Sequence, residues 1–240
     1  MRHRKAAAAA AASVLMMFSA CAAVMGGISS SITTQEFETG YSSVYAETIA
    51  FKGIENKEYE SELNLSVESD VEAAVAEFDV MAQEAAELLP EGVKSTLRIT
   101  QDVKRTDGGF ISFIEEHYIY TGGAHGNTSW FPRNIDTLSA EPHALALSEL
   151  FSDKGYRETI NRLIDEEAAE DPEKYSELWA EPHITEENEN NYYITDEDLV
   201  IFFPPYTLSY YAKGFIEFNI KLTEIEGMLR DEYKRIASAD

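Results

Sequence analysis

A glycine-rich run at residues 121–126 holds the residue types in this 240-residue chain best suited to recognition chemistry. It reads Thr-Gly-Gly-Ala-His-Gly, and glycine, which has no Cβ, lets another backbone approach closely. The residues in and beside this run that we expect to contact a partner are Gly123, His125, Thr128, Ser129 and Trp130. A structural interpretation stays open, in which the glycines supply positive φ in a tight turn and His125 hydrogen-bonds the loop to itself.

The loop at residues 204–211 is a second candidate contact surface. It contains Pro204, Pro205, Tyr206 and Tyr211, which combine a stiff backbone with aromatic rings. Aromatic side chains offer a large contact area at a low cost in conformational entropy, so we expect these four residues to bind a protein partner. The alternative is a rigid corner whose tyrosines cover the core.

The charge balance limits the kind of partner. The chain has 44 acidic and 19 basic residues, a formal net charge of −25. Because phosphate binding needs a basic face, this charge argues against nucleic acid as a partner. Residues 165–198 alone hold 14 acidic residues and one lysine, Lys174. This excess fits a cationic partner, whose approach it accelerates at low salt, or a solvated face.

Signs of catalysis are scarce. The sequence has no Gly-x-Ser-x-Gly, no His-Glu-x-x-His and no phosphate-binding loop, and its single cysteine excludes an internal disulfide and a cysteine-rich zinc site. No second histidine at ligand spacing accompanies His125. We therefore expect no catalytic residue, no metal and no cofactor. A hydrolase would need two carboxylates, or a carboxylate and His125, about 5–10 Å apart in a cleft.

The N-terminus has the pattern of a secretory signal. Arg2, Arg4 and Lys5 precede an uncharged apolar run over residues 6–20. This run is shorter than the roughly 20 residues that span a bilayer, although apolar residues continue to Ile28, so an uncleaved anchor stays open. Removing residues 1–20 takes away three basic residues and no acidic one, which moves the net charge from −25 to −28.

Cys21 lies directly after this run. The tetrapeptide over residues 18–21, Phe-Ser-Ala-Cys, resembles a bacterial lipobox, in which the cysteine is acylated and becomes the new N-terminus. The resemblance predicts a lipoprotein attached to the membrane through Cys21. Ordinary cleavage after Ala20 is the alternative, and both place the mature chain outside the cytoplasm.

Hydrophobic periodicity predicts the elements of the first half of the mature chain. Residues 21–43 are rich in Gly, Ser and Thr, which is typical of a flexible tether. The pattern then predicts a strand over 44–51, a helix over 57–89 with a possible break at 66–70, and strands over 93–104, 110–120 and 128–136. Apolar residues alternate over 93–104, as in a half-buried antiparallel strand, and a hairpin turn follows at 106–109.

The second half is predicted in the same way. It contains a helix over 154–170, a hairpin of strands 192–194 and 199–203, a last strand over 215–220 and a closing helix over 222–236. Helices and antiparallel strands are mixed, which predicts an α+β fold with antiparallel sheets packed against helices. We expect two small subdomains, residues 44–92 and residues 93–240.

Three motifs resemble the extracellular part of the anti-sigma-V factor (RsiV-like) family, of DUF4163/DUF3298 type. The motifs are Tyr-Ile-Tyr-Thr-Gly-Gly-Ala-His-Gly at 118–126, Asn-Ile-Asp at 134–136 and Glu-Leu-Phe at 149–151. Residues 192–193, 199–206 and 211–214 agree with the same family, and residues 45–64 resemble the smaller domain that precedes it. The resemblance covers most of residues 44–225.

The resemblance implies three settings: a membrane anti-sigma factor whose outer domain binds lysozyme, a companion module on a peptidoglycan deacetylase, or a stand-alone secreted or lipid-anchored protein. Five residues precede the apolar run, too few to hold a sigma factor, so we expect the binding module without the anti-sigma function. The expected partner is lysozyme or a similar cationic wall-active protein. The alternative from another class is a module that binds peptidoglycan or another wall polysaccharide.

Overall fold

The computed structural model describes residues 17–19, 27–107, 109–139 and 142–238. Cys21 and most of the predicted signal, residues 1–16 and residue 20, lie outside this range. No helix within it is long and apolar enough to span a membrane.

A seven-stranded sheet is formed by described strands that lie between residues 17 and 144. Its spatial order follows the chain order from β1 to β7. The strands are β1 (Met17–Ser19), β2 (Ser29–Glu38), β3 (Ser42–Lys52), β4 (Ser95–Asp107), β5 (Phe110–Tyr120), β6 (Asn127–Asp136) and β7 (His143–Ala144). All neighbours pair antiparallel except β3 and β4, which are parallel. The predicted subdomain boundary between residues 92 and 93 falls inside this sheet.

A three-stranded antiparallel sheet forms most of the remaining β structure. Its order is β10-β9-β8. The elements of this half are β8 (Tyr192–Ile194), β9 (Asp198–Phe203), β10 (Ile216–Lys221), α2 (Tyr156–Glu170), the short α3 (Leu222–Ile225) and 3-10 helices at Leu147–Glu149, Tyr211–Lys213, Glu226–Met228 and Asp231–Ala237. Two sheets with helices packed against them confirm the α+β class.

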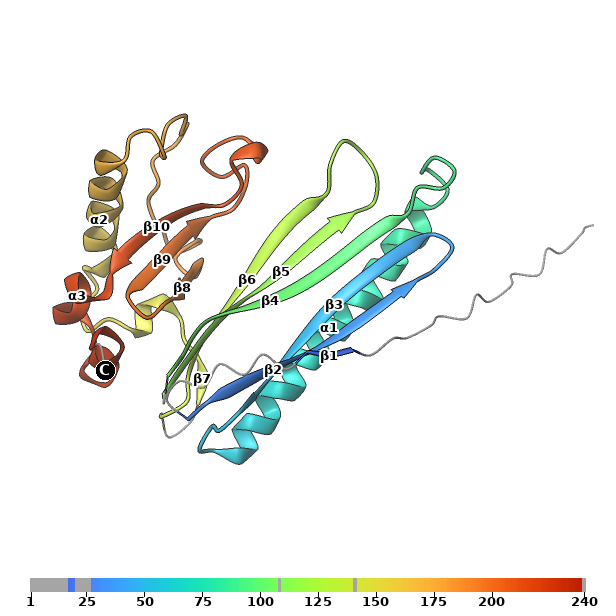
Figure 1. The fold of residues 1–240 in the computed structure, drawn as a ribbon. Coiled ribbons are helices and arrows are strands. Elements are labelled where there is room, and N and C mark those ends of the chain that lie inside the picture. The colour runs from blue at the N-terminus through green and yellow to red at the C-terminus, as the bar shows by residue number, and fades with distance from the viewer. Residues whose placement is uncertain (1–16, 20–26, 108, 140–141, 239–240) are drawn as a thin grey trace, which may run out of the picture.

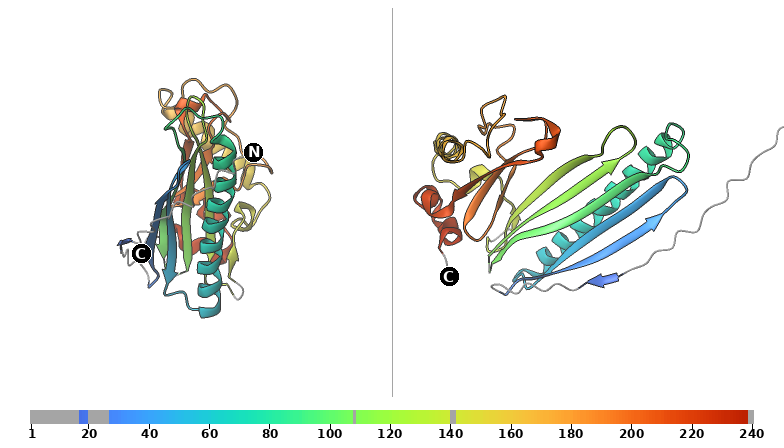
Figure 2. Two further views of the ribbon diagram at one scale, coloured as in Figure 1. Left: turned by 90° about the vertical axis from the view of Figure 1, so that its right-hand side faces the viewer. Right: turned by 45° about the horizontal axis from the view of Figure 1, so that its top comes forward.

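The elements stack in four layers in the order α1, large sheet, small sheet and α2 (Figure 1). Helix α1 and the small sheet cover opposite faces of the large sheet. Helix α1 (Lys57–Ala85) runs along one face of the large sheet, as the side view in Figure 2 shows. On the opposite face, Ile114 of β5 packs with Tyr193, Val200 and Phe202 of the small sheet. The odd-numbered residues of β9 face α2 instead.

Helix α1 explains the parallel pair. It begins at Asn56, whose side chain accepts a hydrogen bond from the backbone N–H of Tyr59 at 3.1 Å. Its 29 residues carry the chain back along the sheet, so that β4 enters at the same end as β3. The predicted break at 66–70 does not occur, because Val67 and Val71 belong to one buried stripe.

The predicted tether over residues 21–43 is wrong where the structure describes it. Residues 29–38 form β2, which pairs with β3 along its whole length, from Ser29 with Lys52 to Glu38 with Ser43. Ile28 is buried in the core beneath the sheet. Serine and threonine accept extended backbone as readily as coil, and here the partner strand β3 decides between them.

The predicted closing helix over residues 222–236 is also wrong. The segment is divided into α3 and two 3-10 helices, and it is interrupted at Leu229, which forms a bridge with Phe151. The backbone N–H of Arg230 donates to the Leu150 carbonyl at 2.9 Å. At Leu229 and Arg230, backbone pairing with Leu150 and Phe151 therefore replaces the hydrogen bonds of a continuous helix.

Buried polar side chains join the two sheets. Ser112 donates to Asn134 Oδ1 at 2.7 Å and accepts from the backbone N–H of Ile194, while Asn134 Nδ2 donates to the Tyr192 carbonyl. The Asn-Ile-Asp motif at 134–136 thus has a structural role. Through Asn134 and Ser112 it satisfies the Tyr192 carbonyl and the Ile194 N–H of β8, which would otherwise be buried without a hydrogen-bond partner.

Candidate partner-binding surface

The two loops predicted to bind a partner lie together at one end of the molecule. The turn over residues 121–126 joins β5 to β6, and the loop over residues 204–211 follows β9 (Figure 1). Tyr211 Oη donates to the Gly126 carbonyl at 2.6 Å, and the rings of Tyr211 and His125 stack at 4.1 Å with an interplanar angle of 14°. Residues 85 positions apart in the sequence therefore form one surface.

The glycine turn has a structural role at several positions. Gly122 and Gly123 have φ of +118° and +94°, which only glycine adopts without strain. At Gly126 a Cβ would lie 2.4 Å from the Tyr118 ring, so a side chain is excluded there. His125 Nδ1 lies 2.8 Å from the Gly126 carbonyl oxygen, and because that oxygen only accepts, Nδ1 carries the proton. Gly123 and His125 nevertheless remain exposed.

The 204–211 loop begins with a strained turn. The Thr207 N–H donates to the Pro204 carbonyl at 3.1 Å, and Tyr206 has φ of +68°. Proline at the second position and positive φ at the third are the features of a type II turn, which normally places glycine where Tyr206 stands. The Tyr206 side chain is 58% exposed.

Residues 177–179, which no sequence motif marks, complete the surface. Trp179 is 58% exposed, and its indole Nε1 donates to the Thr207 carbonyl at 3.2 Å. Glu177, also at φ +68°, accepts a hydrogen bond from Tyr210 Oη at 2.5 Å, and this bond raises the pKa of Tyr210. We call Trp179, Tyr206, Tyr210, Tyr211 and His125 the aromatic loop surface.

Backbone strain is concentrated on this surface. Within the described part of the chain, Glu177 and Tyr206 are the two non-glycine residues with positive φ. Such a conformation costs of order 1 kcal/mol or more, and it persists where surrounding structure enforces it, often at ligand sites.

Five of the predicted contact residues, all outside the aromatic loop surface, are placed differently. Trp130 is half-buried between the sheets, where it stacks on Phe215 at 3.8 Å and donates to Glu116 at 2.7 Å. The structure thus gives Trp130 a packing role. Thr128 shares its face of β6, whereas Ser129 points to the opposite, α1 side, because side chains alternate along a strand. Pro204 and Pro205 are half-buried and shape the turn.

A group of three or more His, Cys, Asp or Glu side chains able to hold a metal is not found among the residues placed by the structure. His125 contacts Tyr211 and Gly126 rather than a carboxylate.

Comparison with known proteins finds a different similarity in each half. Residues 148–223 match the family described as "Protein of unknown function (DUF3298)". Residues 36–128 match the family described as "Deacetylase PdaC". The chain is thus DUF3298-like around the small sheet and PdaC-like over α1 and most of the large sheet. No curated protein matches it.

Two solved structures share the fold. A DUF3298-family protein from Bacteroides fragilis NCTC 9343 superposes with a TM-score of 0.67 at 17% identity, covering 86% of this chain and 95% of that one. A DUF3298-family protein from Pseudomonas aeruginosa PAO1 superposes with a TM-score of 0.50 at 14% identity, covering 93% and 94%. The DUF3298 part of the expected resemblance is confirmed.

Proposed function

We propose that this chain is an extracytoplasmic binding protein, anchored by a lipid at Cys21, that captures lysozyme or a similar cationic wall-active protein through the aromatic loop surface. The observation that carries the proposal is the strained, exposed tyrosine turn beside an exposed tryptophan. Both kinds of ring are enriched at the centres of protein interfaces. The RsiV-like resemblance of the glycine turn supports the choice of lysozyme.

The charge around this surface supports a cationic partner. Asp171, Glu173 and Glu181 are exposed in the same segment as Trp179, and Glu177 is paired at 3.9 Å with Lys213. Exposed acidic groups on this segment accelerate the encounter with a basic protein, and salt screens that acceleration.

Calorimetric titration of lysozyme into the full chain tests the proposal. We expect a Kd of about 1 µM or tighter at low salt, weakening as salt is added. Trp179→Ala is expected to weaken binding about tenfold, since it removes a central aromatic contact. Phe131→Ala is the matched control, because Phe131 is a 46% exposed aromatic residue on the α1 side of β6. Absence of binding at low salt would rule the proposal out.

Binding to wall polysaccharide is the second candidate. Exposed aromatic rings also stack on sugar faces, and the match of residues 36–128 to a family described as a deacetylase favours a carbohydrate context. Sedimentation with purified peptidoglycan, without lysozyme, distinguishes polysaccharide binding from lysozyme binding. Loss of cosedimentation in Trp179→Ala combined with no calorimetric signal for lysozyme would favour the polysaccharide.

A further inference from the structure

The outer edge of β2 is less protected by side chains than the outer edge of β10 in the small sheet. On β10, the side chains of α2 and the segment after it cover edge groups: Glu167 accepts from the Asn219 N–H at 2.6 Å, and Tyr175 donates to the Glu217 carbonyl at 2.8 Å. Natural edge strands are also protected by proline or by charged side chains, above all lysine; β2 contains no lysine or proline, and its charged residues are Glu36 and Glu38. Strand β2 therefore keeps an edge that can accept another strand.

This edge already pairs with an extended segment. Met17–Ser19, which cleavage before Cys21 would remove, form antiparallel pairs with Ile32–Thr34 at the middle of β2. Farther along, at Gln35–Glu38, no strand among those placed by the structure pairs with the outer side of β2. An added strand with the same antiparallel orientation as β1, ending beside Met17, would lie against these four residues.

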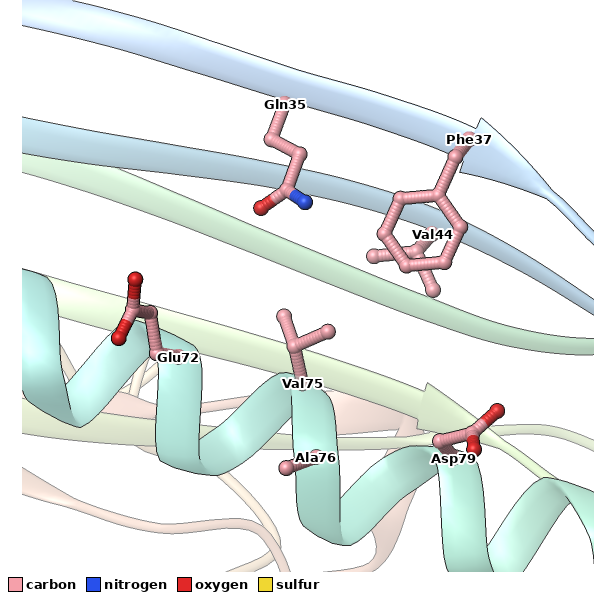
Figure 3. Close-up of a pocket in the computed structure, with 7 residues that line it drawn as sticks. All are labelled: Gln35, Phe37, Val44, Glu72, Val75, Ala76 and Asp79. Atoms are coloured by element: carbon pink, nitrogen blue, oxygen red, sulfur yellow. The ribbon is translucent and has the colours of Figure 1, made fainter. Parts of the chain in front are cut away.

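A groove lies beside this part of the edge. It has a volume of about 390 Å³ and lies between β2, β3 and α1 (Figure 3). Phe37 of β2, Val44 of β3 and Val75 of α1 point toward one another across it. Extended peptides bind in this way between an edge strand and a helix, with main-chain hydrogen bonds to the strand and alternate side chains in the groove.

Acidic groups surround the groove on both sides of the edge. Glu72 and Asp79 of α1 line it, and α1 as a whole carries nine acidic residues and one lysine. Glu36 and Glu38 alternate with Phe37 and therefore project from the opposite face of β2, where both are exposed. Glu38 forms an ion pair with Lys94 at 2.8 Å. The net charge around the groove stays negative despite this lysine.

We propose that the groove between β2 and α1 binds an extended segment of a partner protein in which basic and apolar residues alternate. The segment adds to β2 as an antiparallel strand at Gln35–Glu38. Its apolar side chains enter the groove against Phe37 and Val75, and its basic side chains lie opposite Glu36 and Glu38, where cross-strand pairs of opposite charge are favourable. This surface is separate from the aromatic loop surface, and the inference does not depend on lysozyme.

Binding of the capped peptide Lys-Val-Lys-Val-Lys-Val-Lys to the full chain tests the proposal. We expect amide resonances of residues 35–38 to shift on titration at low salt. The same peptide with proline at its central valine is expected to bind at least about tenfold more weakly, because proline removes a ladder donor. An alternating Glu-Val peptide, with equal strand propensity and opposite charge, is expected not to bind.

Variants locate the groove. Ala76 lines the groove from an exposed helix position, so Ala76→Gln fills the groove and is expected to weaken binding of the Lys-Val peptide about tenfold. The control is Ala73→Gln, on the same helix but away from the groove, which is expected to leave the affinity unchanged. Glu36→Lys is expected to weaken the Lys-Val peptide and to admit the Glu-Val peptide. Equal binding of the proline peptide, or resonance shifts elsewhere, would overturn the proposal. So would a dimer of the full chain that Ala76→Gln dissociates, because a second copy would then occupy the edge.

Discussion

Tyr206 combines strain and exposure in one residue. Its φ of +68° is a conformation that glycine adopts freely and that costs a residue with a Cβ of order 1 kcal/mol. The hydrogen bond from Thr207 to Pro204 and the contact with the Tyr211 ring hold the turn in place. A tyrosine at this position is therefore unfavourable for stability, and we infer that its ring serves recognition.

Replacing Tyr206 separates stability from binding. We expect Tyr206→Gly to have a free energy of unfolding about 1 kcal/mol higher than Tyr206→Ala, since glycine relieves the positive φ while both variants lack the ring. Urea unfolding measures the difference. Both variants are expected to bind lysozyme more weakly than the parent chain. An alanine variant as stable as the glycine variant would show that the turn is not strained.

Strand β2 makes residues 29–38 a folded part of the domain instead of a tether. Its ten residues pair with β3, and Ile28, directly before it, is 2% exposed in a cluster with Ile49, Phe51 and Phe113. The composition of residues 21–43 is typical of a linker. Packing against α1 and β3 nevertheless makes residues 28–38 part of the domain.

Ile28→Ala distinguishes a structured segment from a tether. Truncating a buried isoleucine leaves a cavity, and we expect the free energy of unfolding to fall by about 2–5 kcal/mol. Glu36→Ala, at an exposed position of β2, is the control and is expected to change stability by less than about 0.5 kcal/mol. Thermal or urea unfolding checks both. Equal stability of the two variants would mean that this segment does not pack in solution.

At the scale of the whole molecule, an acid-sensitive cluster holds α2 against the segment that leads into β8. Glu189 is buried and accepts hydrogen bonds from Tyr156 Oη at 2.6 Å and Arg157 Nε at 2.5 Å. Burial by itself raises the pKa of Glu189, but the hydrogen bonds and the charge of Arg157 outweigh burial and lower it below 4.5. Burial, followed by the bond to Glu189, raises the pKa of Tyr156 to about 12.

The sign of the stability change follows from the lowered pKa. A depressed carboxyl pKa stabilises the fold above the unfolded value of 4.5, and this contribution is lost as pH falls through the folded pKa. Glu189→Gln is expected to lower the free energy of unfolding by about 1–3 kcal/mol at pH 7, with the deficit shrinking below pH 4.5. Urea unfolding across pH measures it, with exposed Glu158→Gln as control. A deficit independent of pH would contradict the assignment.

Hydrophobic periodicity and turn residues were sufficient to predict many of the strands and hairpins. Strand β5 was predicted at its observed bounds, and the alternation of Leu97 and Ile99 predicted the buried face of β4. The hairpin at 106–109 and the pairing of β8 with β9 were confirmed. These features depend on periodicity and turn chemistry over a few residues, which a single sequence displays.

The sequence by itself determined the acidic charge, the mixed α+β class and the positions of the glycine-rich and proline-rich turns, because these follow from composition and from residues adjacent in the chain. Only the tertiary structure decided that residues 121–126, 177–179 and 204–211 form one surface. It also decided that Trp130 turns inward onto Phe215 while Trp179 stays exposed. Burial of a lone aromatic residue depends on partners that approach from distant strands, and no local pattern encodes that approach.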